Sequence, residues 1–373
     1  MFHPLVRQWF ETEIGTPTPV QTAAWPVIAD GNHVLVTAPT GSGKTLTAFL
    51  WGLDRLLTGA WQPDGLRILY ISPLKALNND IRLNLLIPLN GLRTLFRARN
   101  VACSDIRVLT RSGDTPARER RSMVKKPPAI LVTTPESLNI MLAHTVSREV
   151  FSTIQTVILD EIHAVAGTPR GVHLMTAVER LVSLAGEFQR IILSATVNPL
   201  ETMAAFAGGF QRIDTTSGPP RFLPRAVTII DAPGKKQYAL SVRFPPSIGP
   251  DEQGTAWEPV ARDLRQMIHR ARSTLVFVNN RRLSEKLALS INQQEGRVAA
   301  FAHHGSLARD LRLDVEHRLK RGELPAIIAT GSLELGIDIG HLDQVVMVQT
   351  PQTVASAVQR AGRANHRVGE TSH

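Results

Sequence analysis

Several features that mark other classes of protein are scarce in this sequence of 373 residues. The single cysteine, Cys103, excludes an internal disulfide and a zinc site built from cysteines, and it suits a reducing cytosol. No stretch approaches the roughly 20 apolar residues that cross a bilayer, and the opening MFHPLVRQWF lacks the apolar core of a secretion signal. With aromatic residues at 5%, no extended base-stacking platform is evident. We therefore expect a cytoplasmic protein without a membrane partner.

The charge of the chain is basic. Lys and Arg number 42 against 32 Asp and Glu, which gives a formal net charge of +10. A positive excess favours a polyanionic partner such as nucleic acid, although charge that only maintains solubility has the same composition.

Short apolar runs rich in β-branched residues alternate with longer amphipathic segments, a pattern typical of parallel sheets built from βαβ units. A first series comprises HVLVTA, RILYIS, AILVTT, TVILDE and RIILSA, and a second comprises STLVFVN, RVAAFAHH, AIIATG and QVVMVQT. A stretch dense in proline and glycine separates the two series. We predict an α/β fold with one domain over 1–214, an inter-domain region with lead-in strands over 215–255, and a second domain over 256–373.

The segment APTGSGKTLTAFLW follows the first apolar run. Its small residues can bend the backbone so that successive N–H groups face one anion, and the helix that follows adds its positive end. Lys44 can bind the β- and γ-phosphates, and the Thr45 hydroxyl can bind Mg²⁺. An alanine stands at position 38, where such loops usually have their first glycine. The residues expected to bind ATP here are Pro39, Thr40, Gly41, Ser42, Gly43, Lys44 and Thr45.

The sequence DEIH follows the apolar run STIQTVIL. A metal ion bound to phosphates needs an acidic partner, and the attacking water needs a base or an orienting group, so Asp160 and Glu161 suit these two roles. The carboxyl ends of parallel strands face one crevice, which would bring this segment to the phosphate loop. An acidic helix cap explains one carboxylate better than two, and no zinc-ligand spacing surrounds His163.

These motifs together resemble a known family. APTGSGKT, DEIH, the SAT at 194–196, ATGSLELGIDIG and QRAGRANHR are similar in order to motifs I, II, III, V and VI of superfamily 2 helicases. TPTPVQ, ISPLKALNND, RSGDTP, TTPESL, DEIHAVAG, HHGSL and SLELGIDIG resemble its large helicase-related (Lhr) family, over nearly the whole chain. The resemblance implies two RecA-like domains of the P-loop NTPase class that hydrolyse ATP with Mg²⁺.

The resemblance also implies roles for residues outside the phosphate loop. Gln21 matches the glutamine that reads the adenine edge, and Asp338 matches a residue at the ribose. Arg360 and Arg363 match arginines that approach the phosphates from the second domain, where such groups raise the rate by about 10³- to 10⁵-fold. His366 stands where many relatives have another arginine, so no role is assigned to it.

A third set of residues is implied to couple the two domains. Gln359 belongs with the catalytic arginines and would pair with His163 across the cleft between the domains. Ser194 and Thr196, from the SAT motif, complete the coupling set.

The resemblance implies a path for one nucleic-acid strand. Each of its residues has an alternative reading as a helix cap or turn residue, and hydroxyl and backbone N–H groups bind phosphate without reading bases. The implied contacts are Pro73, Lys75, Ala76, Arg111, Thr134, Pro135 and Glu136 in the first domain, and Ser306 and Thr330 in the second.

The expected function is that of an ATP-dependent helicase or translocase core. By resemblance it moves 3′ to 5′ on single-stranded DNA and displaces a DNA or RNA strand, the latter from an RNA–DNA hybrid. Two alternatives are an ATP-gated clamp that binds nucleic acid without unwinding it, and a protein translocase. Lhr-like proteins continue beyond the final RVGETSH, so we expect a fragment or a short member that binds ATP but displaces strands poorly.

Overall fold

The computed structural model describes residues 1–39, 41–73, 75–195, 198–214, 219–232, 237–244, 257–333, 342–351, 353–364 and 371–372. The chain divides into two compact units, unit 1 (Met1–Pro233) and unit 2 (Gly234–His373). In both, strands alternate with helices and nearly all strand pairs are parallel, so the predicted α/β class is confirmed. Within the described ranges, no helix combines the length and the apolar character needed to cross a membrane.

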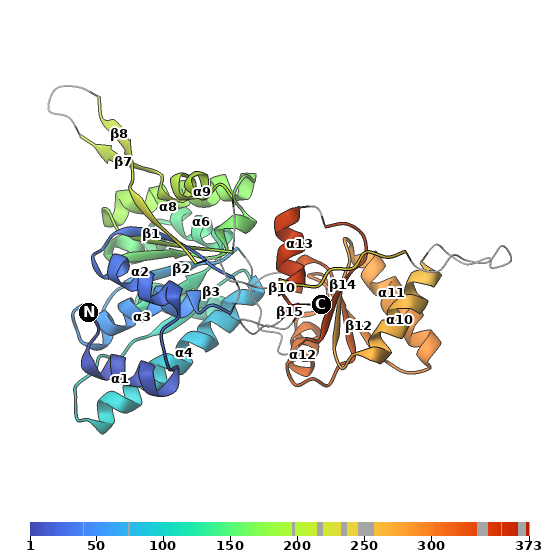
Figure 1. Ribbon diagram of the computed structural model, residues 1–373. Helices are drawn as coiled ribbons and strands as arrows, with labels where there is room; N and C mark the ends of the chain where they lie inside the picture. The colour runs from blue at the N-terminus through green and yellow to red at the C-terminus, as the bar shows by residue number, and fades with distance from the viewer. Residues whose placement is uncertain are drawn as a thin grey trace. The chain divides into compact units, whose positions relative to one another are not determined.

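Unit 1 is built on a parallel sheet (Figure 1). Its described strands follow the order β3-β4-β2-β5-β6-β1-β9. These strands are β1 (His33–Thr37), β2 (Ile68–Ile71), β3 (Val108–Arg111), β4 (Ile130–Thr133), β5 (Thr156–Leu159), β6 (Gln189–Ser194) and β9 (Val227–Asp231). The helices are α1 (Pro4–Glu13), α2 (Pro19–Ala29), α3 (Lys44–Leu57), α4 (Lys75–Ala98), α5 (Ala117–Lys125), α6 (Pro135–Ala143), α7 (Thr145–Arg148), α8 (Pro169–Ala185) and α9 (Leu200–Gly208), with 3₁₀ turns at Glu149–Thr153 and Ile162–Ala164.

Helices cover both faces of this sheet, which explains why its strands are apolar throughout. In β1, Val34 and Val36 pack in a core with α1 to α4, whereas Leu35 packs in a core with α6, α8 and α9. In β2, Tyr70 packs in the first of these cores and Leu69 packs in the second. Burial of each such aliphatic side chain contributes about 1.5–3 kcal/mol. A hydrophobic core on each face therefore stabilises the sheet, and residues at its strand ends have fixed positions.

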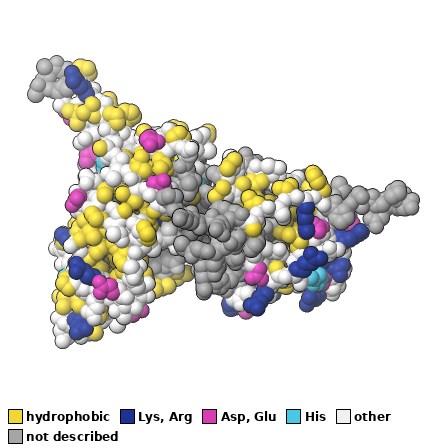
Figure 2. Space-filling view, in the orientation of Figure 1, with side chains coloured by type: hydrophobic (Ala, Val, Ile, Leu, Met, Phe, Trp, Pro, Cys, Tyr) yellow, Lys and Arg dark blue, Asp and Glu magenta, His cyan; other side chains and the backbone are white. Residues whose placement is uncertain are grey.

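A hairpin extends away from the rest of unit 1 (Figure 1). Its strands β7 (Phe210–Ile213) and β8 (Arg221–Pro224) pair antiparallel, and Figure 2 shows hydrophobic side chains gathered on it. At its base the Arg225 guanidinium donates to both Glu179 and Glu187 at 2.9 Å. The predicted inter-domain region 215–255 thus includes β8 and β9, and β9 pairs with β1.

Unit 2 is built on a smaller parallel sheet whose described strands follow the order β12-β13-β11-β14. These strands correspond to the second series of apolar runs, and they are β11 (Thr274–Phe277), β12 (Ala300–His303), β13 (Ala326–Ala329) and β14 (Gln344–Met347). The other elements are α10 (Glu258–Arg270), α11 (Arg281–Glu295), α12 (Arg309–Lys320), α13 (Val354–Ala361), a 3₁₀ turn at Gly331–Leu333, and the short pair β10 (Gln237–Tyr238) and β15 (Thr371–Ser372).

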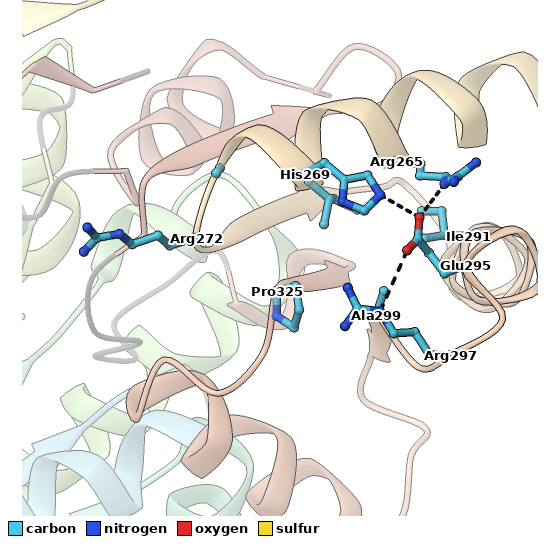
Figure 3. Close-up of a pocket in the computed structure, with 10 residues that line it drawn as sticks. Arg265, His269, Arg272, Ile291, Glu295, Arg297, Ala299 and Pro325 are labelled. Carbon is cyan, nitrogen blue, oxygen red and sulfur yellow. Dashed lines mark hydrogen bonds and ion pairs between the residues drawn. The ribbon is translucent and has the colours of Figure 1, made fainter.

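Helices α10 and α11 are joined by a charged cluster (Figure 3). Glu295, at the end of α11, accepts hydrogen bonds from Arg265 Nε and, at 2.7 Å, from His269 Nε2. A cavity of about 240 Å³ adjoins this cluster and reaches Ala299 and Pro325, the residues just before β12 and β13. It therefore lies where the strands of unit 2 begin, at the edge opposite to their carboxyl ends.

Candidate functional site

The phosphate loop follows β1 and ends in helix α3. Gly41 and Gly43 have φ angles of +81° and +83°, on either side of Ser42. This left-handed geometry suits glycine and turns successive N–H groups toward one side, as an anion-binding loop requires. The Lys44 ammonium group is largely buried and donates to the Ala38 and Pro39 carbonyl oxygens at 2.5 and 2.8 Å. A cation, glycine backbone and a helix start are thus brought together, as predicted for this segment.

Gln21 lies directly against this loop. It belongs to the capping box of α2, in which Thr18 N donates to Gln21 Oε1 at 2.9 Å. The Thr18 hydroxyl in turn donates to the Ser42 carbonyl oxygen at 3.1 Å. A Cβ atom added to Gly43 would come within 2.7 Å of Gln21 Nε2. The buried Gln21 amide and the loop are therefore packed together, which places this glutamine beside the predicted phosphate loop.

The two carboxylates of DEIH lie at the carboxyl end of β5. Both are largely buried, and Asp160 accepts hydrogen bonds from the Tyr70 hydroxyl and, at 2.9 Å, from Glu161 N. Burial, followed by the nearby Glu161 carboxylate, raises the pKa of Asp160 to about 7, against the opposing effects of the Tyr70 hydroxyl and the Lys44 charge. Glu161 has φ +47°, a conformation that costs energy in a residue with a side chain. Two buried acids and a strained backbone are typical of a functional site.

These residues suit a divalent cation. A positive ion would offset the repulsion and the desolvation that raise the pKa of Asp160. Mg²⁺ is usually held by one or two carboxylates together with phosphate oxygens and water. In the described part of the chain, no group of three His, Cys, Asp or Glu side chains could hold a metal by itself. The donor set therefore fits Mg²⁺ that arrives with a phosphate ligand better than a structural metal.

His163 connects the carboxylates with the strand next to β5. Its Nδ1 atom accepts from Ala195 N at 3.2 Å and faces Ser194 Oγ at 3.2 Å. Its Nε2 atom lies 3.4 Å from Glu161 Oε2. The Thr37 hydroxyl, at the end of β1, donates to the Ala195 carbonyl oxygen at 3.3 Å. The end of β6 therefore contacts both the DEIH segment and the strand before the phosphate loop, which joins three predicted motifs.

The implied nucleic-acid contacts of unit 1 lie on the other half of the same edge. Pro73 follows β2, Arg111 ends β3, and Thr134 caps helix α6 directly after β4. Because β3, β4 and β2 are neighbours in the sheet, these positions are adjacent. Thr134 accepts from Ser137 N at 3.3 Å, as its alternative reading as a cap predicts. The capping role does not exclude a phosphate contact by backbone groups at the helix start.

Arg170 is a residue of this cluster that sequence reasoning missed. From α8, it donates through Nε to Glu136 Oε1 and through Nη2 to the Pro73 carbonyl oxygen, both at 2.5 Å. It thereby bridges two of the implied contacts, while Pro135 forms the first turn of α6. No motif contains Arg170, because the residues it bridges lie 34 and 97 positions away.

In unit 2, the implied contacts Ser306 and Thr330 also follow strand ends. Thr330 N donates to the carbonyl oxygen of His303, the last residue of β12, at 3.2 Å. Arg281, at the start of α11, donates to Ser306 Oγ at 2.9 Å. Sequence reasoning missed this arginine, whose exposed guanidinium adds a positive charge beside the predicted phosphate contact.

The arginines of the last motif belong to unit 2. Arg360 lies in α13 and Arg363 just after it, and both are nearly fully buried, while Gln359 precedes Arg360 on the same helix. The Arg360 guanidinium lies 5.1 Å from the ring centroid of Phe277 and donates to Asn279 Oδ1 at 3.4 Å. Phe277 and Asn279, both of unit 2, therefore contact the Arg360 side chain.

Some predicted site residues lie outside the described ranges. These are Thr40 in the phosphate loop, Thr196 in the SAT motif and Asp338 in the segment LGIDIG. The side chains of Lys75 and Ala76 also lie outside the description, although their backbone begins helix α4. Thr45 is in the first turn of α3, directly after Lys44.

Comparison with known proteins supports the order of motifs. The DEAD/DEAH box helicase profile matches residues 18–204, and the profile of the helicase conserved C-terminal domain matches residues 260–369. The chain is 41% identical to a protein of Mycolicibacterium smegmatis named Lhr helicase/probable uracil glycosylase, and 43% identical to ATP-dependent helicase Lhr-Core protein 2 of Thermococcus barophilus. These matches cover 100% and 98% of this chain but 26% and 42% of the relatives, so the chain spans less than half of their length.

A solved structure agrees with these matches. Mycobacterium smegmatis helicase Lhr, bound to ssDNA and AMP-PNP, has a TM-score of 0.86 and 43% sequence identity to this chain. The match covers 100% of this chain and 47% of that one. The predicted resemblance to the large helicase-related family is thus confirmed in sequence and in fold.

Proposed function

Because the chain belongs to the DEAD/DEAH box helicase family, we propose that it is the core of a helicase that couples ATP hydrolysis to movement along one nucleic-acid strand. The observation that carries the proposal is the sheet edge of unit 1. There the phosphate loop follows β1, and Asp160 and Glu161 follow β5. Residues Pro73, Arg111 and Thr134 lie at the carboxyl ends of β2, β3 and β4 in the same parallel sheet. One edge thus provides both a nucleotide site and a strand path.

In this proposal the residues of unit 1 divide the chemistry among them. Lys44 and the backbone N–H groups of the loop bind the β- and γ-phosphates of ATP, and Thr45 with Asp160 would hold Mg²⁺. Mg²⁺, when bound, would neutralise charge that develops on the phosphates. Glu161 orients the attacking water and accepts its proton, and Gln21 selects adenine. Asp338 at the ribose, and Arg360 and Arg363 at the phosphates, complete the set from the second domain, and Gln359 pairs with His163.

The proposed partner is single-stranded DNA, with RNA or an RNA–DNA hybrid as a further substrate. Its support is the ssDNA in the related mycobacterial structure and the uncharged or backbone character of most implied contacts. Such contacts bind the sugar–phosphate chain, so low sequence specificity is expected. We propose movement in the 3′ to 5′ direction, which rests on the family resemblance.

A strand-displacement assay tests the proposal. Duplexes labelled with a fluorophore and a quencher, with a 3′ tail or a 5′ tail, are mixed with the protein and ATP, and AMP-PNP replaces ATP in the control. The proposal predicts that release of the labelled strand, although weak for this chain, occurs only with ATP and mainly from the 3′-tailed duplex. Binding of the tail without release by this chain would favour an ATP-gated clamp, and preference for the 5′ tail would contradict the proposed direction.

A further inference from the structure

Tyr70 connects two motifs of the nucleotide site from inside the core of unit 1. It lies in β2, where it is opposite Ile158 of the neighbouring strand β5, and it is completely buried. Its hydroxyl donates to Oδ2 of Asp160, two residues beyond Ile158. Its ring stacks on Phe49 of helix α3, with 5.3 Å between ring centroids and an interplanar angle of 21°. One side chain thus contacts both the helix of the phosphate loop and the first acid of DEIH.

The hydroxyl of Tyr70 requires an explanation that packing does not give. A phenylalanine would fill the same apolar core, and a buried hydroxyl is costly unless it forms a hydrogen bond. The hydrogen bond goes to a carboxylate, which gives a stronger interaction than a neutral acceptor. Together with Glu161 N, which donates to Oδ1, it provides one donor for each oxygen of the Asp160 carboxylate. Two donors on different oxygens fix the plane of that carboxylate.

We propose that Tyr70 is a positioning residue that orients the Asp160 carboxylate for Mg²⁺ and ties it to helix α3. The proposal rests on the proposed function, because it assumes that ATP and Mg²⁺ bind at this edge. The Tyr70 hydroxyl and Glu161 N each bind a different oxygen of the carboxylate, so a further lone pair on each oxygen remains for Mg²⁺. The stacked Tyr70 ring packs β2 against α3. This contact keeps the distance between the phosphate loop and Asp160 constant. Partners of this kind, behind a metal ligand, typically affect metal affinity by about 10- to 100-fold.

Nucleotide binding with and without Mg²⁺ tests this role separately from turnover. The affinity of a fluorescent ATP analogue is measured in Mg²⁺ and in EDTA for the wild type and for Tyr70→Phe, which removes only the hydroxyl. We expect the affinity in EDTA to be unchanged, and the Mg²⁺ concentration at half-maximal binding to rise about tenfold. Ile130→Val, a mild change in the same core at the far end of β4, is the matched control and should leave the Mg²⁺ dependence unchanged.

A double-mutant cycle separates positioning from a general packing effect. If Tyr70 acts through Asp160, Tyr70→Phe should add nothing to the Mg²⁺ dependence in an Asp160→Asn background. An additive effect in that background, or a Mg²⁺ titration of Tyr70→Phe that matches the wild type, would overturn the proposal and leave the proposed function intact. Failure of the wild type to bind the nucleotide in either buffer would instead contradict the proposed function, and this inference with it.

Discussion

The Nε2 atom of His163 lies 3.4 Å from Oε2 of Glu161, while its Nδ1 atom accepts a hydrogen bond from Ala195 N. Because Nδ1 is an acceptor, the ring proton is assigned to Nε2, on the side that faces the carboxylate. His163 therefore contacts both the end of β6 and Glu161, the residue proposed to orient the attacking water. A shift at the end of β6 would thus change the position of the Glu161 carboxylate. This relationship gives a local physical basis for the coupling role that the sequence predicts for His163 and Ser194.

Substitution of His163 by alanine tests this coupling. We expect His163→Ala to bind ATP normally but to hydrolyse it about tenfold or more slowly in the presence of single-stranded DNA, because Glu161 loses the group that orients it. The measurements are nucleotide affinity and steady-state ATPase rate. His173→Ala, which removes an exposed histidine from α8, is the control. Equal stimulated rates in His163→Ala and wild type would rule out this role.

The contact between Gly43 and Gln21 predicts a specific effect on nucleotide binding. Gly43→Ala places a Cβ atom 2.7 Å from Gln21 Nε2 and adds backbone strain at φ +83°. Gly31→Ala has nearly the same φ, +79°, but no atom within 4 Å of the new Cβ. Both variants should lose about 1–2 kcal/mol of stability through strain. Only Gly43→Ala should also bind ATP more weakly, by about tenfold, or roughly 1.4 kcal/mol. Equal ATP affinities of the two variants would contradict the account of Gln21.

Glu179 neutralises two buried arginines at the base of the hairpin. It accepts from Arg190, which is completely buried, and from Arg225, each at 2.9 Å. Glu179→Ala removes the carboxylate that Arg190 contacts and leaves Arg225 with Glu187 alone. Breaking such buried pairs costs about 3–5 kcal/mol. We expect the free energy of unfolding to fall by about 3 kcal/mol, at the low end of this range, since the Glu179 side chain is 38% exposed. Urea unfolding measures this free energy, and Glu11→Ala, at an exposed position, is the control. Losses of similar size in both variants would show that Glu179 does not neutralise the buried arginines.

His33 makes the stability of unit 1 depend on pH. Its pKa is lowered from 6.5 by burial and then by the charges of Arg190 and Arg225, against smaller opposing effects of Glu187 and Glu179. Its Nδ1 atom also accepts from Arg190 N at 3.1 Å, which requires a deprotonated nitrogen. The unfolded chain therefore binds the proton more readily, so the free energy of unfolding falls as pH drops below 6.5.

The pH effect is measured by urea unfolding at pH 7.5 and pH 5.5. The wild type should lose more stability between these values than His33→Gln, in which the titrating ring is absent. If both proteins lose the same amount, His33 does not titrate as the structure indicates, and other groups account for the pH dependence.

The strands of both sheets could be predicted largely because parallel strands buried on two faces are apolar throughout. All nine apolar runs contain a strand, from His33–Thr37 to Gln344–Met347. Strand β3, with the sequence VLTR, is not predicted by its pattern, because it is short and ends in an arginine. The sequence places strand β9 in the region between the domains, because prolines flank it and its pairing with β1 depends on a contact between distant parts of the chain.

The site could be predicted where a motif is contiguous and not where it depends on packing. Asp160 and Glu161 are recognisable because two acids follow one buried strand. Tyr70 and Arg170 carry no such signal, since their partners lie 90 and up to 97 positions away. Their roles depend on which strands are neighbours, and local sequence patterns do not determine that order.

ATP hydrolysis by the wild type and by Glu161→Gln, with and without single-stranded DNA, tests the central claim most directly. In the proposed function, one edge of unit 1 binds ATP, orients water through Glu161 and responds to a nucleic-acid strand. We predict that DNA stimulates the wild type, and that Glu161→Gln binds ATP with unchanged affinity but loses nearly all turnover in both conditions. Hydrolysis by Glu161→Gln at the wild-type rate, or a wild-type rate that does not change with DNA, would contradict the account.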